Sequence, residues 1–209
     1  MPSKLKSFKR RAAAFSEKDA THRENLRLLF APGAVFKSVL FETCDMNLAT
    51  LNNAVFDECT FRSCRLVGAN FRAAQLDRCT FVDCEMPGVS FEGARMRAVG
   101  FDSCELEGSS FLGAVLQAPV SILKCGLMNA DLRFYECDNG QPSFVKSDLR
   151  GVTFSVNCEF WNATFDEKAT ADFGRVFARA SKDDDLISMV KERWGAEAYD
   201  AVDTYMRRD

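Results

Sequence analysis

The sequence predicts an all-β solenoid, in which short strands stack coil upon coil around one apolar core. From Phe36 to Leu116 every fifth residue is large and apolar, and two positions before each lies Ala, Cys, Ser or Val. The pattern also sorts by side-chain type at every fourth repeat, as the phenylalanines show at Phe41, Phe61, Phe81 and Phe101. A fixed period decides an architecture before local propensities do, since each repeat must bury its apolar side against its neighbours.

A period of five fits neither regular secondary structure alone. Five steps turn a helix by about 500° and move a strand residue to the opposite face, so neither keeps every fifth residue inside. A chain that turns a corner every five residues keeps each fifth residue inside. The pattern resembles that of the pentapeptide-repeat proteins, whose consensus is a small residue, a polar one, a central Leu or Phe, and two polar ones. This resemblance implies a right-handed quadrilateral parallel β-helix, in which four fives close one square coil.

A column of cysteines supports a 20-residue coil. If every fourth repeat stacks, one face carries a ladder of thiols, at Cys44, Cys64, Cys84, Cys104 and, one residue late, Cys125. Stacked side chains lie ~4.8 Å apart, which exceeds the ~3.5 to 4.5 Å between the Cβ atoms of a disulfide. A line of thiols also lacks the four converging ligands that zinc needs. Because Cys alternates here with Ala and Val, we interpret the ladder as small core residues and expect no metal.

Beyond Leu116 the repeat continues with interruptions. One extra residue between Gln117 and Ser121 leads to Ile122, and the segment from Phe134 to Pro142 is interpreted as a loop that bulges from a corner. The last central residue is Phe165. We therefore expect a β-helix over residues 34–166, with about six to seven 20-residue coils.

The N-terminal residues 1–33 are interpreted as a basic arm followed by a helical cap, because a solenoid must cover its open ends. Thr21 and Glu24 form a capping-box signature. A run of leucines follows, and Pro32 with Gly33 is expected to end the helix before the first coil.

The C-terminal residues 167–209 are interpreted as a helical cap or tail. Phe173, Val176, Phe177 and Ala180 form one apolar stripe at helical spacing. A tail of this length exceeds what one coil needs, so a contact with a partner or a second copy is the alternative. Members of the resembled family often dimerise through a C-terminal coil, which implies a possible homodimer through this end.

Composition places the chain among soluble globular proteins, with 47% hydrophobic and 27% charged residues in a chain of 209. No stretch approaches the ~18 apolar residues of a membrane span, and the N-terminus lacks the apolar region of a signal peptide. Nine cysteines, an odd number, fit a reducing compartment. We expect a cytoplasmic protein without membrane contact.

Charge is distributed unevenly along the chain. Residues 1–33 carry eight Lys/Arg and three Asp/Glu, residues 34–166 carry 11 and 17, and residues 167–209 carry eight and ten. A basic arm is compatible with nucleic acid or an acidic membrane surface, although a solvated tail, or one resting on the acidic body, is the commoner explanation. No direct binding of nucleic acid is expected from the acidic β-helix.

The sequence offers no catalytic constellation. The only histidine, His22, lies in the basic arm without a neighbouring Cys or paired carboxylate, and we interpret it as solvated. No phosphate-binding loop, metalloprotease helix or CxxC pair is present. An enzyme would also need a cleft that a filled phenylalanine core does not provide. We therefore expect no enzyme activity and no cofactor.

The first functional hypothesis is a scaffold or adaptor that presents flat faces to a protein partner. Aromatic residues near the loop at 134–142 are the candidate contacts, since such residues dominate interfaces. The residues expected to be exposed are Phe134, Tyr135 and Trp161, with the apolar positions Val67, Leu112 and Met128. The alternative is that these side chains only cover the loop.

The second hypothesis follows from the resemblance. The best-characterised relatives bind DNA gyrase and topoisomerase IV and protect them from quinolones or other poisons by imitating DNA. An acidic strip lies on the face of the cysteine ladder, interrupted by Arg65, at Asp45, Glu85, Glu105 and Glu107. B-DNA carries about 18 charges over ~30 Å, whereas residues 34–166 carry 11 positive and 17 negative side chains. The scaffold hypothesis therefore ranks first.

Overall fold

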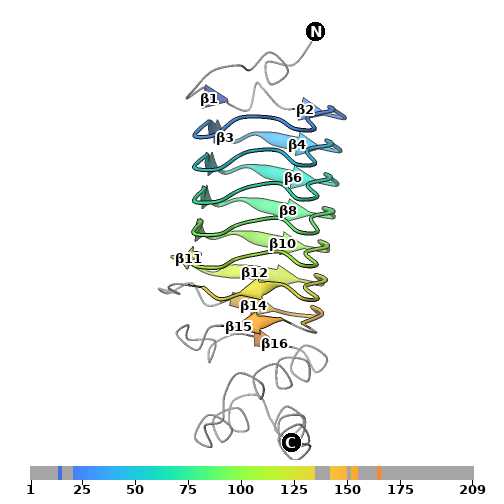
Figure 1. The fold of residues 1–209 in the computed structure, drawn as a ribbon, viewed down its shortest axis with the longest axis vertical. Coiled ribbons are helices and arrows are strands. Elements are labelled where there is room, and N and C mark those ends of the chain that lie inside the picture. Colours follow the sequence, from blue (N-terminus) through green and yellow to red (C-terminus); the bar gives the residue numbers. More distant parts are fainter. Residues whose placement is uncertain (1–13, 16–20, 135–141, 150–151, 155–163, 166–209) are drawn as a thin grey trace, which may run out of the picture.

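The computed structural model describes residues 14–15, 21–134, 142–149, 152–154 and 164–165. These residues form a parallel β-solenoid, whose strands stack coil upon coil along the long axis of the molecule (Figure 1). The described residues contain strands and turns but no helix. The expected all-β solenoid is therefore confirmed.

Two faces of the solenoid are continuous parallel sheets. Face A has six strands, in the spatial order β1 (Ala14–Phe15), β3 (Val35–Lys37), β5 (Val55–Asp57), β7 (Gln75–Asp77), β9 (Arg95–Arg97) and β11 (Val115–Leu116). Face B has eight, in the order β2 (Thr21–His22), β4 (Leu40–Glu42), β6 (Thr60–Arg62), β8 (Thr80–Val82), β10 (Gly100–Asp102), β12 (Val120–Leu123), β14 (Pro142–Phe144) and β16 (Thr164–Phe165).

The other two faces are held by single bridges. Face C carries the bridged column Asn25, Asp45, Arg65, Glu85, Glu105, Gly126 and Asp148. Face D carries the bridged column Phe30, Thr50, Asn70, Ser90, Ser110 and Asp131, and continues as the strand pair β13 (Asp131–Leu132) and β15 (Thr153–Phe154). The four columns of each coil make the quadrilateral cross-section that the period of five predicts.

The corners depend on backbone with positive φ. On faces C and D the chain forms a tight turn, as where Ala34 N donates to Ala31 O at 3.3 Å and Gly33 has a φ of 68°. A type II turn favours Pro followed by Gly at its two central positions. Pro32–Gly33 and Pro87–Gly88 have this order.

The core is a filled stack of phenylalanine rings. Phe81 is fully buried and stacks on Phe61, with 4.6 Å between ring centroids, and on Phe101, at 5.0 Å. Across the core its ring meets the edges of Phe71 and Phe91 at 6.1 and 6.0 Å. Rings stacked along a face and edge-to-face across the core match the geometries that aromatic pairs prefer.

The register shows where residues are inserted. Phe41 pairs with Phe61, and Phe61 pairs with Phe81, so partners in these coils are separated by four repeats of five. Gly100 pairs with Ser121, so the extra residue expected after Leu116 is confirmed.

Two more residues are inserted before β14, because Val120 pairs with Pro142. The expected 134–142 loop is partly wrong: Phe134 is buried, and Pro142 belongs to a strand.

The helix expected within residues 21–33 is wrong. Thr21–His22 is strand β2, and the residues after it form a coil bridged to the next one, as between Phe30 and Thr50. Pro32–Gly33 is therefore a turn of face D and not a helix stop. The solenoid begins upstream of residue 34, at least as early as Ala14, since β1 pairs with β3.

Counting in fives back from Phe36 gives Ala31 and Leu26, both buried. The first coil escaped recognition because the usual sizes are exchanged, with Leu29 at the small position and Ala31 at the large one. The C-terminal helical tail at 167–209 lies outside the described residues. The count of six to seven coils stays a prediction.

Candidate protein-binding surfaces

The acidic strip expected on face C is divided by an ion pair. Asp45, Arg65, Glu85 and Glu105 follow one another in the bridged column. Arg65 Nε lies 2.9 Å from Glu85 Oε2, so this arginine neutralises one carboxylate of the strip. The strip therefore does not present a continuous row of negative charge.

A denser acidic cluster extends from the corner where face B meets face C across face C. It consists of Asp83, Asp102, Glu105 and Glu107, which we call the acidic edge. Within the described part of the chain, none of these carboxylates forms an ion pair, and only Asp102 accepts a side-chain hydrogen bond, from Ser103 Oγ at 2.9 Å. The acidic edge thus concentrates uncompensated negative charge within two neighbouring coils.

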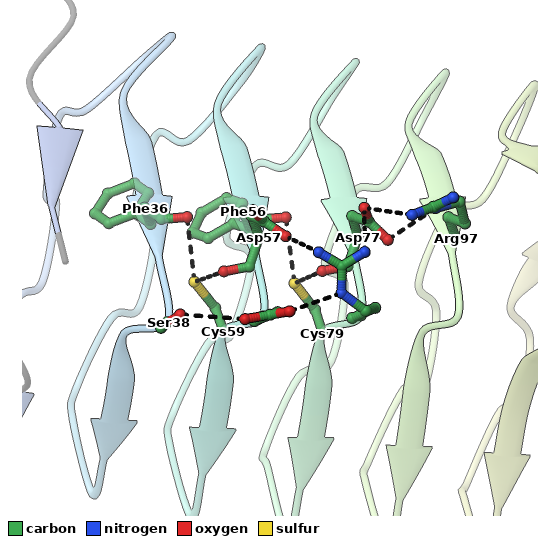
Figure 2. A network of polar contacts seen from close by, with 10 residues as sticks. Phe36, Ser38, Phe56, Asp57, Cys59, Asp77, Cys79 and Arg97 are labelled. Atoms are coloured by element: carbon green, nitrogen blue, oxygen red, sulfur yellow. Dashed lines mark hydrogen bonds and ion pairs between the residues drawn. The ribbon is translucent and has the colours of Figure 1, made fainter. Parts of the chain in front are cut away.

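Face A carries a compensated network of charges, shown in Figure 2. Arg78 lies 2.6 Å from Asp57, 3.0 Å from Glu58 and 2.9 Å from Asp77. The Nε and Nη2 atoms of Arg97 donate to both carboxylate oxygens of Asp77, at 2.9 and 3.0 Å. Because cations and carboxylates satisfy one another here, this face offers less free charge to a partner.

Hydrogen bonding shifts the pKa values of this network. The hydrogen bond from Arg97, aided by the charge of Arg78 and opposed by slight burial, lowers the pKa of Asp77 below its usual value. The carboxylate of Glu58, with those of Asp77 and Asp57, raises the pKa of Arg78. This network was not predicted from the sequence because its partners lie one coil apart. When the sequence is arranged in rows of four repeats, Asp57, Asp77 and Arg97 fall in one column.

The thiol ladder lies inside the corner between faces B and C. The structure buries Cys44, Cys64, Cys84, Cys104 and Cys125, each at 2% exposure or less. Cys84 Sγ contacts the carbonyl oxygen of Phe61 at 3.5 Å, and Cys104 Sγ that of Phe81 at 3.4 Å.

A second, shorter thiol column, Cys59 and Cys79, bonds to Phe36 and Phe56 in the same way (Figure 2).

In the middle of the ladder, the thiols of Cys64, Cys84 and Cys104 have raised pKa values, whereas the hydrogen bond with Cys104 lowers the pKa of Cys125 at its end. A hydrogen bond with the Cys104 thiol, opposed by one with Cys64 and reinforced by burial, raises the pKa of Cys84 to about 12. Ser147 continues the column, and its hydroxyl donates to the carbonyl of Ile122 at 3.0 Å. A metal ligand must be a thiolate that converges with others, whereas these thiols point at backbone carbonyls.

The structure also exposes an apolar surface that the sequence analysis missed. Leu28 is 67% exposed, Phe30 66% and Leu48 50%. The three residues lie where face C meets face D, in two neighbouring coils, and we call them the apolar corner. The helical interpretation of residues 21–33 concealed Leu28 and Phe30, whereas Leu48 lies within the recognised repeats and was not singled out. Counting in fives places all three side chains outside.

The contact residues expected near residue 134 are only partly described. Phe134 is 3% exposed and packs edge-on against Phe111, with 6.0 Å between centroids, so its expected exposure is wrong. Tyr135 and Trp161 lie outside the described residues. Leu112 is exposed, whereas Val67 and Met128 are half-buried.

Fold, period and surface together define a solenoid whose described charged groups lie on its outer faces, apart from Glu24, one carboxylate oxygen of which is buried. Two family models match the chain, "Pentapeptide repeats (8 copies)" over residues 34–72 and "Pentapeptide repeat region" over residues 54–132. The chain belongs to the pentapeptide-repeat proteins.

Three solved structures illustrate the likeness, which concerns the fold. A trypsin-treated form of QnrB1, described as a plasmid-mediated fluoroquinolone resistance protein, has 16% identity and a TM-score of 0.46, covering 81% of this chain and 96% of that one. Rfr23 from the cyanobacterium Cyanothece has 14% identity and a TM-score of 0.26, covering 75% and 86%. HetL from Nostoc, involved in regulating heterocyst differentiation, has 15% identity and a TM-score of 0.25, covering 73% and 89%.

No curated protein matches the chain. Among the described residues, no helix has the length and apolar character needed to cross a bilayer.

Proposed function

We propose that the chain is a cytoplasmic, non-catalytic scaffold that binds a basic surface of a protein partner through its acidic edge. The observation that carries the proposal is that, among the described residues, Asp83, Asp102, Glu105 and Glu107 have no cationic partner. Most arginines of the middle coils already have carboxylate partners, as Arg65, Arg78 and Arg97 do. Negative charge left uncompensated on a rigid face steers and orients a basic partner.

The filled core supports a role without catalysis. The interior of the coils is occupied by phenylalanine rings in mutual contact, such as Phe61, Phe81 and Phe91. Apart from Glu24, one carboxylate oxygen of which is buried, the described charged side chains lie on outer faces, where water weakens every electrostatic interaction. Recognition of a macromolecule by a flat, regular surface needs no cleft, which is how solenoids commonly bind.

Affinity purification with matched variants tests this proposal. Bait carrying Glu105→Gln and Glu107→Gln is expected to lose the partner, because two unpaired charges are removed. The control bait carries Glu92→Gln, which also removes a carboxylate, but one that Arg72 pairs with at 2.9 Å. Loss in both baits, or in neither, would contradict the acidic edge as the binding site.

A second candidate function is DNA-mimicking binding of DNA gyrase or topoisomerase IV, which the acidic edge also favours. Four carboxylates over two coils of ~4.8 Å each amount to about one charge per 2.4 Å, near the one per ~1.7 Å of B-DNA. Arg62 and Arg65 precede this cluster and Lys124 follows it. The DNA-like stretch therefore spans only about 10 Å, and this candidate ranks second.

A gyrase supercoiling assay, with and without a quinolone, separates the two candidates. Inhibition or protection that the Glu105→Gln, Glu107→Gln variant abolishes would support DNA mimicry. An unaffected gyrase at every protein concentration would eliminate it and leave the scaffold proposal to the purification experiment.

A further inference from the structure

The apolar corner combines two unfavourable features. Its three members, Leu28, Phe30 and Leu48, are at least half exposed, and the one other exposed large hydrophobic residue among those described is Leu112 at 41%. Exposed apolar side chains are common singly, but neighbouring ones mark interaction sites. Leu28 N donates to Asn47 O at 3.0 Å, which fixes the two leucine-bearing coils side by side.

The backbone of the two leucines is also disfavoured. Leu28 has a φ of 57° and Leu48 a φ of 58°, in the left-handed region. The next three coils place glycine in this column, at Gly68, Gly88 and Gly108, all with positive φ. A side chain in this conformation is disfavoured relative to glycine. Leucine at this corner therefore adds an exposed apolar side chain at a position that the next three coils fill with glycine.

The charges beside the apolar corner are balanced and unpaired. Arg27 and Asp45 lie on face C in the same two coils, and within the described residues neither forms an ion pair. In the following coils, by contrast, Arg65 pairs with Glu85 and Arg72 with Glu92. Among the described side chains, one free cation and one free anion therefore flank the apolar corner.

We propose that the apolar corner is a self-association surface, at which two copies of this chain form a dimer. A second copy brings an equal apolar surface together with one carboxylate and one guanidinium, so both free charges can be paired across the interface. A partner with charge of a single sign would leave either Arg27 or Asp45 without a counterion. Self-complementarity of this kind is what a twofold interface requires.

The size of the apolar corner fits this role. Two leucines and a phenylalanine exposed to this degree present a few hundred Å² of apolar surface. A standard interface buries about 800 Å² on each partner, of which somewhat more than half is apolar. The corner can therefore supply most of the apolar part of such an interface, with polar side chains around it forming the rim.

This inference goes beyond the proposed function, because the two surfaces are separate. Asp45 and Glu105 belong to the same column of face C but lie three coils apart, or about 14 Å. Dimerisation at the apolar corner would leave both acidic edges of the dimer accessible. Failure of one proposal therefore does not decide the other.

Sedimentation velocity on the full chain over a wide concentration range tests the proposal. The wild type is expected to sediment as a dimer. Leu28→Gly with Leu48→Gly, which restores the residue of the next three coils, is expected to raise the dissociation constant by at least about ten-fold. Leu112→Ser is the matched control, since it removes an exposed leucine elsewhere, and it should leave the dimer intact.

A charge exchange tests self-recognition. Arg27→Glu alone is expected to weaken the dimer, and adding Asp45→Arg is expected to restore it, because the two copies again carry both signs. A wild type that stays monomeric at all concentrations would overturn the proposal. So would a dimer that the double glycine variant leaves unchanged, since the contact would then lie elsewhere. Circular dichroism establishes that each variant is folded, and Phe30→Ser provides a second test of the same surface.

Discussion

Arg97 and Asp77 form a two-pronged ion pair between neighbouring coils, with Nε and Nη2 donating to the two carboxylate oxygens at 2.9 and 3.0 Å. Asp77 also contacts Arg78 at 2.9 Å. One carboxylate thus joins two arginines of two coils. Such pairs across exposed faces contribute little each, but here they repeat along face A and align successive strands.

Asp77→Asn is expected to lower the free energy of unfolding at neutral pH by about 0.5–1 kcal/mol, a range set by solvent screening of exposed pairs. Because the pKa of Asp77 is lowered in the folded state, its contribution is fully present above the unfolded pKa of ~3.9. It is lost as pH falls through the lower folded value. Urea unfolding of both proteins from pH 7 downward measures this difference. A difference that persists unchanged at pH 2 would refute the assignment.

Phe81→Ala is expected to destabilise the fold by about 3–5 kcal/mol, the usual cost of deleting a buried aromatic ring. Phe81 is fully buried and contacts rings of its own face and of the opposite one. Leu112→Ala is the control, because this side chain is 41% exposed and lies outside the apolar corner, and its effect should stay within ~0.5 kcal/mol. Equal losses in urea unfolding would show that the core is not packed as described.

Gly68→Ala and Gly88→Ala form an informative pair. Both glycines have positive φ, 63° and 64°, so both substitutions strain the backbone, at about 1–2 kcal/mol. A Cβ at Gly68 would also lie 2.9 Å from Leu48 Cδ2, whereas one at Gly88 meets nothing within 4 Å. Leu48 can turn away by leaving its rotamer, which costs about 0.5–1.5 kcal/mol.

Gly68→Ala should therefore be the more destabilising of the two in thermal or urea unfolding. The difference should vanish when Leu48 is replaced by Ala. An excess cost that survives this replacement would mean that another group crowds residue 68.

The thiols of Cys84 and Cys104 are expected to resist alkylation in the folded protein. Their pKa values are raised to about 12, which reduces the thiolate fraction about a thousand-fold relative to an ordinary thiol at pH 8. Burial adds to this protection. Iodoacetamide labelling followed by peptide mass mapping, with and without urea, measures it residue by residue. Rapid labelling of either cysteine in the native protein would contradict the buried ladder.

The repeated part of the fold could be predicted because its period is a property of the chain itself. Every fifth residue from Phe36 to Leu116 occupies an equivalent position in the coil. Side-chain size alone therefore predicts which residues are buried and which are exposed. The first coil could not be recognised so easily, since Leu29 and Ala31 exchange the usual sizes. Leu26 to Phe30 then mimic a helix, although Leu29 N donates to Leu26 O within a tight turn.

The candidate surfaces were less predictable than the core. Counting in fives predicts which residues belong to the acidic strip. Whether Arg65 neutralises one of its carboxylates depends on the direction in which this long side chain extends toward the neighbouring coil. Two of the three residues of the apolar corner, Leu28 and Phe30, lie in the first coil, which was interpreted as a helix. The burial of Phe134 against Phe111 depends on where the two-residue insertion after β13 leaves the chain, which no local pattern specifies.

The constant register between Phe41, Phe61 and Phe81 makes the rod modular in length. Removing or duplicating one complete coil between Phe41 and Phe81 would rejoin equivalent positions, so each strand would find a partner of the same kind. Such a change would shift the apolar corner relative to the acidic edge by ~4.8 Å per coil. The spacing between these two surfaces is thus a quantity that evolution, or an engineer, can adjust in uniform steps without redesigning either one.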